Sequence, residues 1–380
     1  MDLIKQAKLD IDWRLFLVMV PLLGAGLITM NSFTGENSFY GKQIIWVTLG
    51  MVLFFVFSLI DWRFLRRTWV SVTLFIFSTL LLLALFVTSQ ATKGAVSWFD
   101  FGAFSLQPSD PIKIFVIIIL AKYFSRRHVE IANFRHLLVS GFYAGVIFLL
   151  VFLQPDFGSA IIIFMIWLGM VLVSGISKKH LLLVFTAGVI VFGLLWGFVF
   201  APYQKDRIQT FLHPLTDTTG AGYNAIQSTI AVGSGEITGK GIGYGTQSRL
   251  EFLPEYETDF IFAAFSEEWG FLGVLVLFLL FGILFWRILV NALHGATNFE
   301  ILFGLGVAIY LMSHFIIHVG MNIGLLPVTG TTIPFLSYGG SHLFTEFMAL
   351  GILMGMRKYR KAYHKDDTKN EFLGVERMLS

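Results

Sequence analysis

The sequence predicts an all-α polytopic membrane protein, folded as a single bundle of about ten transmembrane helices. Of its 380 residues, 56% are hydrophobic and only 13% are charged, and the mean hydropathy is +0.75. Soluble domains carry roughly twice that share of charged residues, so the composition excludes a water-soluble enzyme and a disordered chain. The absence of cysteine excludes disulfides and cysteine nucleophiles, and the net charge of +3 gives no indication of nucleic-acid binding.

Ten apolar segments are candidates for the spanning helices, because each approaches the length of about 20 residues that a span requires. In chain order they cover residues 15–30, 44–60, 69–88, 111–124, 137–153, 157–173, 181–200, 260–289, 301–319 and 343–356. Helices are expected throughout, since lipid offers no partner to an unpaired backbone amide. The first segment has no small-residue cleavage site at its end, which favours a retained helix over a signal peptide.

The loop charges predict the orientation of the bundle. Most of the 27 Lys and Arg side chains lie in loops on one side of it, and the positive-inside rule makes that side cytoplasmic. Both termini are then cytoplasmic, which requires an even number of spans. The transmembrane domain is expected to cover residues 1–357, followed by a charged cytoplasmic tail over 358–380.

A long extracellular loop, residues 201–259, is expected between the seventh and eighth helices. Loops beyond about 15 residues are usually functional or disordered. This loop alternates glycines, which permit close approach of backbone to ligand, with the amide and hydroxyl groups of Gln227, Ser228 and Gln247. Such groups could recognise a polyhydroxylated or phosphorylated ligand; the alternative is a flexible surface loop.

Charged residues beside apolar segments are expensive in lipid and therefore point to function. Lys113 follows Asp110 by three residues, so the two side chains are neighbours on a helix and are expected to form an ion pair. The alternative is a lysine that snorkels to the membrane surface. The fourth span is only about 21 Å long at 1.5 Å per residue, which favours a cavity beside it.

Asp259 lies where the long loop enters the eighth helix, a position suited to a general base or to an N-cap. Helical spacing predicts that Asp259 and Glu267 border one groove, whereas Glu268 faces another partner.

Histidines gather around the last outer loop. His314 and His318 share one helix face, as do His342 and Glu346. A zinc site is an alternative there, but satisfied hydrogen bonds are the favoured interpretation.

Taken in order, the polar motifs resemble those of the SEDS family (shape, elongation, division and sporulation), whose members include RodA and FtsW. The resemblance runs from the first span to the last, and each motif alone is weak. The main motifs are Gln107-Pro-Ser-Asp-Pro-Ile-Lys113, Gln154-Pro-Asp-Phe-Gly158, Thr258-Asp-Phe-Ile-Phe-Ala263 and Pro334-Phe-x-Ser-Tyr-Gly-Gly-Ser341.

The resemblance implies a peptidoglycan glycosyltransferase that polymerises lipid II on the outer face of the bacterial cytoplasmic membrane. A class B penicillin-binding protein would be its transpeptidase partner, and undecaprenyl diphosphate its lipid product. Asp259 matches the essential aspartate of the family, Lys113 its fourth-span lysine, and Asp110 the acidic partner of that lysine.

The implied reaction converts an α-linked sugar diphosphate into a β-1,4 linkage and so inverts the configuration. It needs a base on the acceptor hydroxyl, for which Asp259 is the candidate, and positive charge on the departing diphosphate. Arg207, Lys240 and Lys113 are candidates for that charge, and a divalent cation, Mg²⁺ or Mn²⁺, is an alternative. Ser337 of the final motif is a further candidate for substrate binding; no protein metal site is predicted.

Several residues depart from the family pattern. Asp110 replaces the usual Glu, and His342 and Glu346 replace small or amide residues. The run Val328-Thr-Gly330 favours the elongation type, RodA-like, over the division type, FtsW-like. Two rival functions are a lipid II flippase and a non-catalytic scaffold for a cell-wall synthase.

Overall fold

A computed structural model describes residues 11–33, 38–88, 97–100, 105–125, 134–200, 202–216, 220–250 and 252–358. Within these ranges the chain is helical apart from turns and one short antiparallel hairpin, in which β1 (Phe99–Asp100) pairs with β2 (Ser105–Leu106). The predicted cytoplasmic tail lies outside the described residues from 359 onward.

Every predicted span coincides with a helix, and the all-α membrane fold is confirmed. Among the described residues, seven helices are long and apolar enough to cross a membrane: α1, α2, α3, α5, α7, α11 and α12. The count of ten crossings stays a prediction, because α4, α6 and α13 are shorter or less apolar. The ten helices are α1 (Trp13–Ser32), α2 (Ser38–Leu59), α3 (Thr68–Thr88), α4 (Ser109–Ser125), α5 (Phe134–Leu153), α6 (Phe157–Val173), α7 (Lys178–Leu194), α11 (Ile261–Leu293), α12 (Asn298–Asn322) and α13 (Gly340–Arg357).

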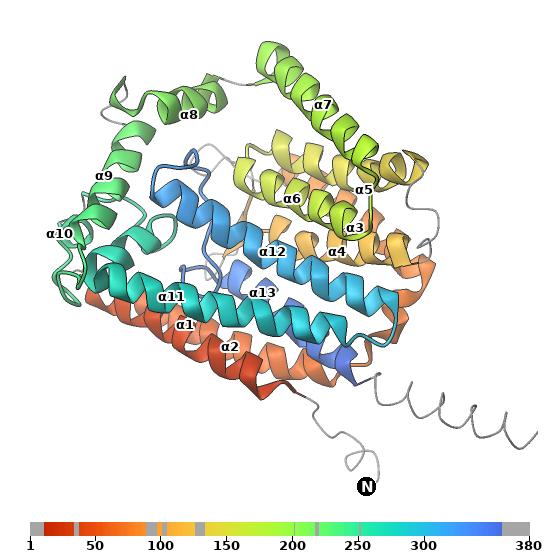
Figure 1. The fold of residues 1–380 in the computed structure, drawn as a ribbon, viewed down its shortest axis with the longest axis horizontal. Helices are drawn as coiled ribbons and strands as arrows, with labels where there is room; N and C mark the ends of the chain where they lie inside the picture. The colour runs from red at the N-terminus through yellow and green to blue at the C-terminus, as the bar shows by residue number, and fades with distance from the viewer. Residues whose placement is uncertain are drawn as a thin grey trace, which may run out of the picture.

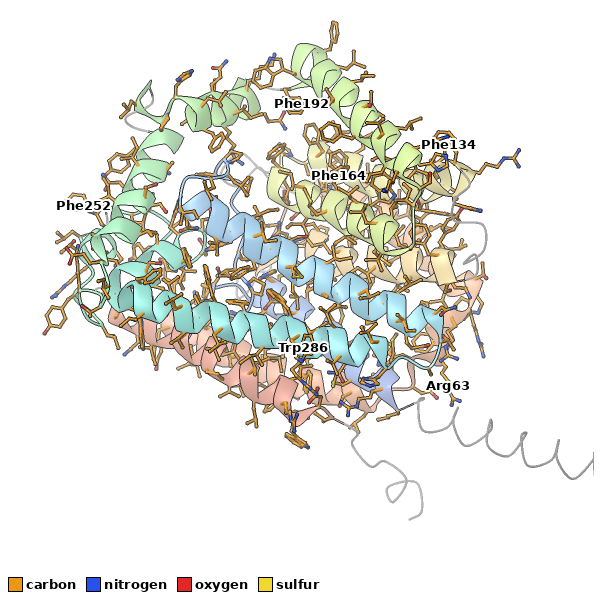
Figure 2. The ribbon with its side chains drawn as sticks, in the orientation of Figure 1. Arg63, Phe134, Phe164, Phe192, Phe252 and Trp286 are labelled. Carbon is orange, nitrogen blue, oxygen red and sulfur yellow. The ribbon has the colours of Figure 1, made fainter. Side chains whose placement is uncertain are left out.

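The bundle is arranged around α4, α12 and α13, which carry the largest share of buried side chains. In Figure 1, α1, α2 and α11 lie along one side of α12, and α3, α5 and α6 lie along the other. Large apolar side chains such as Phe164, Phe192 and Trp286 remain exposed on the outer surface (Figure 2). Such a surface is typical of helices that face lipid. The short fourth helix is therefore a central element of the bundle, buried among longer helices.

Helix α7 lies at the periphery of the bundle (Figure 1), and none of its membrane-length window is buried. It continues into a π-helical turn, η2 (Leu195–Val199), from which the chain leaves for the region before α11.

The described residues between 202 and 259 are largely helices and turns, not the flexible surface loop that was the alternative interpretation of this region. They contain α8 (Pro202–Leu212), the 3₁₀ turn η3 (Pro214–Thr216), α9 (Ala221–Ser234) and the single turn α10 (Thr246–Arg249). These helices form an arm at one end of the bundle (Figure 1), with α9 packed against α11. A second 3₁₀ turn, η1 (Trp62–Arg66), connects α2 to α3.

Helix α11 is interrupted at Gly270, whose φ of 64° and ψ of −170° are inaccessible to other residues without strain. The segment 236–241 inserts its backbone at this break. Lys240 N donates to Glu267 O at 2.9 Å and Phe271 N donates to Glu236 O at 2.9 Å. The backbone groups freed by the break are thus satisfied by the arm, as burial requires.

Candidate active site

Asp259 lies immediately before α11. The N-cap position belongs to Phe260, which has no side-chain hydrogen-bonding group, so the capping alternative for Asp259 is wrong. Asp259 is half-buried, and its backbone carbonyl accepts a 3.0 Å hydrogen bond from Asn322 Nδ2. Its carboxylate lies against Gly330, because a Cβ built on that glycine would be 3.4 Å from Asp259 Oδ2. The backbone of Asp259 is therefore held while its carboxylate faces a residue without a side chain.

The turn of residues 333–338 supports the segment that carries Asp259. Ser337 Oγ donates to Thr258 O at 2.9 Å, and Tyr338 N donates to Glu257 O at 2.9 Å. Ser337 Oγ also accepts from Ile333 N at 2.9 Å. The Ser337 hydroxyl, a candidate for substrate binding, therefore bonds to protein backbone on both sides. Burial raises the pKa of Tyr338, so this phenol stays neutral at physiological pH.

Asp110 and Lys113 form the predicted ion pair. Lys113 Nζ lies 2.9 Å from Asp110 Oδ1, and the two side chains are only 2% and 4% exposed. The alternative of a lysine that snorkels to the surface is wrong, because both charges are enclosed by the bundle.

A cluster of buried polar side chains continues from this pair. His342 lies with Nε2 2.7 Å from Glu346 Oε1 and with Nδ1 4.0 Å from Asp110 Oδ1. The ring of His314 lies 4.6 Å from that of His342. His314 and His318 each bring Nδ1 against a backbone carbonyl, at 3.1 Å and 2.7 Å. Hydrogen bonding thus accounts for one nitrogen of each ring, whereas Nε2 of both histidines is buried without a hydrogen-bond partner among the described residues, so the predicted satisfaction is confirmed only in part. No group of three or more His, Asp or Glu side chains in the described part of the chain is arranged to hold a metal ion.

Three motifs that are distant in the sequence meet beside the Asp110–Lys113 pair. Asp156 accepts hydrogen bonds from Gln107 Nε2 at 2.7 Å and from Ser109 Oγ at 3.2 Å, and it caps α6 through Ser159 N. Ser341 Oγ donates to the carbonyl of Gln107 at 3.2 Å. Asp156 and Ser341 therefore join the N-termini of α4, α6 and α13 at one point.

Glu267 does not border a groove with Asp259, contrary to the helical-spacing prediction. Its side chain is fully buried and accepts from Lys240 Nζ at 2.7 Å, Thr246 N at 2.9 Å and Gln247 N at 3.1 Å. The predicted site residues Lys240 and Gln247 are thereby tied to a carboxylate of α11. By accepting several charge-assisted hydrogen bonds, the Glu267 carboxylate holds residues 240–247 of the glycine-rich segment in place.

Glu268 does face a different partner, as predicted. It accepts from Ser32 Oγ of α1 at 2.5 Å and from Gly243 N at 3.0 Å.

Asn322 at the end of α12 is a site residue that the sequence reasoning missed. It is fully buried, and besides holding Asp259 O it accepts from Ala263 N at 3.2 Å and from Ser228 Oγ at 3.3 Å. Ser228, predicted to bind substrate, therefore joins α9 to α12, while its neighbour Gln227 is half-buried on the same helix. The sequence signal that could have identified Asn322 is its polar side chain at the end of a long apolar helix.

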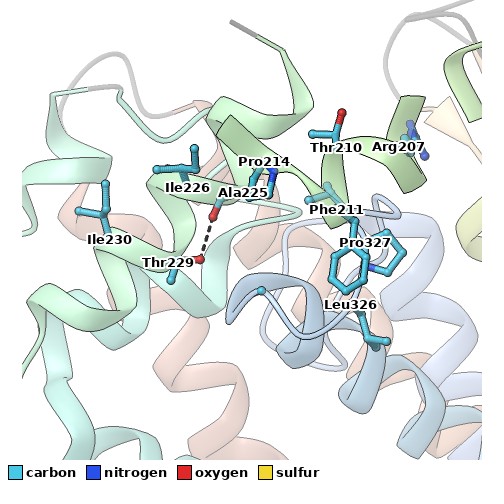
Figure 3. Close-up of a pocket in the computed structure, with 12 residues that line it drawn as sticks. Arg207, Thr210, Phe211, Pro214, Ala225, Ile226, Thr229, Ile230, Leu326 and Pro327 are labelled. Carbon is cyan, nitrogen blue, oxygen red and sulfur yellow. Dashed lines mark hydrogen bonds between the residues drawn. The ribbon is translucent and has the colours of Figure 1, made fainter. Parts of the chain in front are cut away.

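Arg207 lines an apolar cavity of about 280 Å³ between α8, α9 and the segment after α12. In Figure 3, Phe211 of α8 lies beside Pro327. Val328 also lines the cavity, two residues before the glycine that contacts the Asp259 carboxylate. The cavity and Asp259 thus border the same segment, and Arg207 adds a cation to a lining that is apolar apart from Thr210 and Thr229.

The family model of the FtsW, RodA and SpoVE cell cycle proteins matches residues 11–362. The chain belongs to this family. It is 34% identical to stage V sporulation protein E of Bacillus subtilis over 93% of this chain and 99% of that protein. It is also 34% identical to peptidoglycan glycosyltransferase MrdB of Escherichia coli K12, over 94% of this chain and 96% of that protein.

Solved structures show the same fold. The rod shape determining protein RodA of Thermus thermophilus aligns with a TM-score of 0.69 at 26% identity, over 92% of this chain and 97% of that one. A chain of a peptidoglycan synthase complex that coordinates polymerization and crosslinking aligns with a TM-score of 0.78 at 28% identity, over 92% and 98%. The chain is therefore a multi-pass membrane protein of the SEDS family.

Proposed function

We propose that the chain is a bacterial peptidoglycan glycosyltransferase that polymerises lipid II into β-1,4-linked glycan strands. The observation that carries the proposal is the placement of Asp259. Its backbone is held by Asn322 and its carboxylate lies against Gly330, on the segment that also borders the cavity with Arg207. Relatives named as peptidoglycan glycosyltransferases match this chain over nearly its full length, which supports the same activity here.

In the proposed reaction, Asp259 removes the proton from the 4-hydroxyl of the acceptor N-acetylglucosamine. That oxygen attacks the anomeric carbon of the donor, the bond to the diphosphate breaks, and undecaprenyl diphosphate leaves with the bonding electrons. The configuration inverts because attack and departure occur on opposite faces of the sugar. A carboxylate whose backbone is held in place by Asn322 and whose side chain lies against Gly330 suits this step.

Arg207 is the first candidate to neutralise the departing diphosphate. Lys240 and Lys113 are each paired with a buried carboxylate, so each contributes less net charge than Arg207. The apolar walls around Arg207 suit a segment of the prenyl tail beside its phosphates, as a lipid-linked substrate requires. We further propose that a divalent cation, Mg²⁺ or Mn²⁺, shares this charge by arriving with the diphosphate.

The site is proposed to face the outside of the cytoplasmic membrane, with both termini inside. Basic side chains such as Arg63 lie at the end of the bundle opposite Phe252 and the arm (Figure 2), which agrees with the positive-inside rule. A class B penicillin-binding protein is the proposed partner, since a similar chain belongs to a complex that couples polymerization with crosslinking. Val328-Thr-Gly330 favours the elongation type.

The test is polymerisation of purified lipid II by the detergent-solubilised protein, with and without its transpeptidase partner. Asp259→Asn and Asp259→Ala are expected to lower the rate by about 10²–10⁴-fold while the protein stays folded, because only the base is lost. Asp61→Asn, an exposed carboxylate beside Arg63 at the other end, is the matched control and should retain the rate.

Detergent micelles have no sealed leaflets, so polymerisation there distinguishes an enzyme from a flippase. Full activity in the Asp259 variants would remove the assignment. Partner binding without any wild-type polymerisation would favour the scaffold.

A further inference from the structure

We infer that Glu346 is a positioning residue for Asp259, and that His342 couples it to the Asp110–Lys113 pair. Glu346 contacts neither the Asp259 carboxylate nor the proposed lipid cavity; it acts through the turn of residues 333–338. The inference rests on the proposed function for its kinetic readout, but its structural readout is independent of activity.

Glu346 holds this turn at its most strained residue. Its side chain is fully buried on α13, and Oε2 accepts a 3.0 Å hydrogen bond from Phe335 N. Phe335 has a φ of 60°, a left-handed conformation that an aromatic residue adopts only when its surroundings enforce it. A charge-assisted hydrogen bond to the amide of that residue is a direct means of enforcement. The T-shaped contact between Phe335 and Phe347 holds the side chain of the same residue.

The turn then transmits its position to Asp259. Ser337 Oγ and Tyr338 N donate to the carbonyls of Thr258 and Glu257, the two residues before Asp259. On its other sides the turn is fitted closely between helices. A Cβ on Gly26 of α1 would approach Leu336 O to 2.5 Å, and Gln43 Nε2 of α2 donates to Ser337 O at 3.1 Å. Because the turn is packed tightly on these sides, a displacement of Phe335 is expected to move the backbone that supports Asp259.

His342 links this support to the buried ion pair. One ring nitrogen lies 2.7 Å from Glu346 Oε1 and the other lies 4.0 Å from Asp110 Oδ1. The two oxygens of Glu346 thus face different groups, the Phe335 amide of the turn and His342 one helical turn earlier on α13. Lys113, Asp110, His342 and Glu346 thus form a row of buried polar side chains that ends at the turn, in which the 4.0 Å step between His342 and Asp110 is too long for a hydrogen bond. The row places α4 and the turn that supports Asp259 on two sides of the same buried cluster.

The first experiment compares Glu346→Leu with Glu346→Gln in the lipid II polymerisation assay. Leu removes the acceptor for the Phe335 amide, and kcat is expected to fall about 10- to 100-fold with KM changed less than about twofold, because misplacement affects the base rather than binding. Gln keeps an oxygen for that amide, and it should restore most of kcat. His342→Leu should lower kcat in the same direction.

Glu300→Leu is the matched control. Glu300 is an equally buried carboxylate, 2% exposed, but it binds Arg66 and Thr297 at the far end of α12. Its loss should reduce stability without changing the kcat of the folded fraction.

Hydrogen–deuterium exchange on the same full-length variants gives the readout that needs no activity. Glu346→Leu should raise exchange at residues 333–338 and 255–260, whereas Glu300→Leu should leave both segments unchanged. If Glu346→Leu does not fold, Glu346→Asp replaces it, since the shorter carboxylate cannot reach the Phe335 amide in the same geometry.

Unchanged kcat and unchanged exchange in a folded Glu346 variant would overturn the inference. The inference would also be overturned if Glu346→Gln and Glu346→Leu gave the same kcat and the same hydrogen–deuterium exchange. If the wild-type protein does not polymerise lipid II, the proposed function fails by itself, and the exchange pattern still decides whether Glu346 holds the Asp259 segment.

Discussion

Lys113 is among the largest fully buried side chains of the described chain, and its charge is tolerable only because Asp110 lies 2.9 Å away. Desolvation of two charges is expensive, and their attraction roughly offsets it when the geometry is good. Removing one partner is much worse than removing both, because the remaining charge is left buried without compensation.

This asymmetry predicts the behaviour of single and double variants. Lys113→Met is expected to lower the free energy of unfolding by about 3–5 kcal/mol. The double variant Asp110→Asn/Lys113→Met should regain a substantial part of that loss, because neither buried charge remains. Denaturant unfolding in mixed micelles measures both. Equal destabilisation in the single and double variants would contradict the compensation argument.

At the scale of single elements, the break in α11 joins a membrane helix to the arm that covers the site. Gly270 allows the break, and the backbone of residues 236–241 approaches it very closely. A Cβ at Gly270 would lie 2.1 Å from Gly239 N, closer than any real side chain is found. The two helical parts are therefore held together by the backbone of residues 236–241 as well as by the chain itself.

Gly270→Ala is expected to destabilise the protein by at least about 1–3 kcal/mol from backbone conformation alone, with the steric clash in addition. Gly282→Ala is the matched control, because Gly282 lies in the exposed interior of the same helix with nothing within 4 Å of its Cβ position. That substitution should be neutral or stabilising by up to about 1 kcal/mol. Thermal unfolding and limited proteolysis of the arm measure the difference, and similar results for both variants would contradict a special role for the break.

At the scale of the whole molecule, Asp12 ties the first helix to the last. Its carboxylate caps α1 through Arg14 N, accepts from Arg287 and Asn291 of α11, and lies 3.7 Å from Arg357 of α13. Burial raises the pKa of Asp12, but hydrogen bonds from Asn291 and Arg287 and the charge of Arg287 outweigh it, so the pKa lies below its ordinary value of 3.8.

Because the pKa of Asp12 is lower in the folded state, the ionised carboxylate stabilises the fold fully above pH 3.8. That contribution is lost as the pH falls through the lowered folded-state pKa. Unfolding free energies measured from pH 6 downward should therefore fall more steeply for the wild type than for Asp12→Asn at the acid end. Asp61→Asn, which removes an exposed pair, should change stability by only about 0–1 kcal/mol. Parallel wild-type and Asp12→Asn curves would contradict the assignment.

The sequence pattern was sufficient to predict those features that depend on interactions between residues close together in the chain. The ten helices were predictable because a backbone in lipid must satisfy its own hydrogen bonds, and Asp110 and Lys113 were predictable because three residues are one helical turn. Asp259 was identifiable as a carboxylate at a helix entrance. Its capping role was wrongly considered because helix ends shift by a residue or two between pattern and structure.

Contacts between helices that are distant in the sequence decided the side-chain partners within the site. The sequence determined the membrane class, the helices, the buried ion pair and the family motifs. Only the tertiary structure decided that Glu267 binds Lys240, that Asn322 holds Asp259, and that Glu346 supports the turn at Phe335. The physical reason is that spacing along a helix defines which side chains share a face. The partner across that face depends on how separate helices pack, and no local pattern records it.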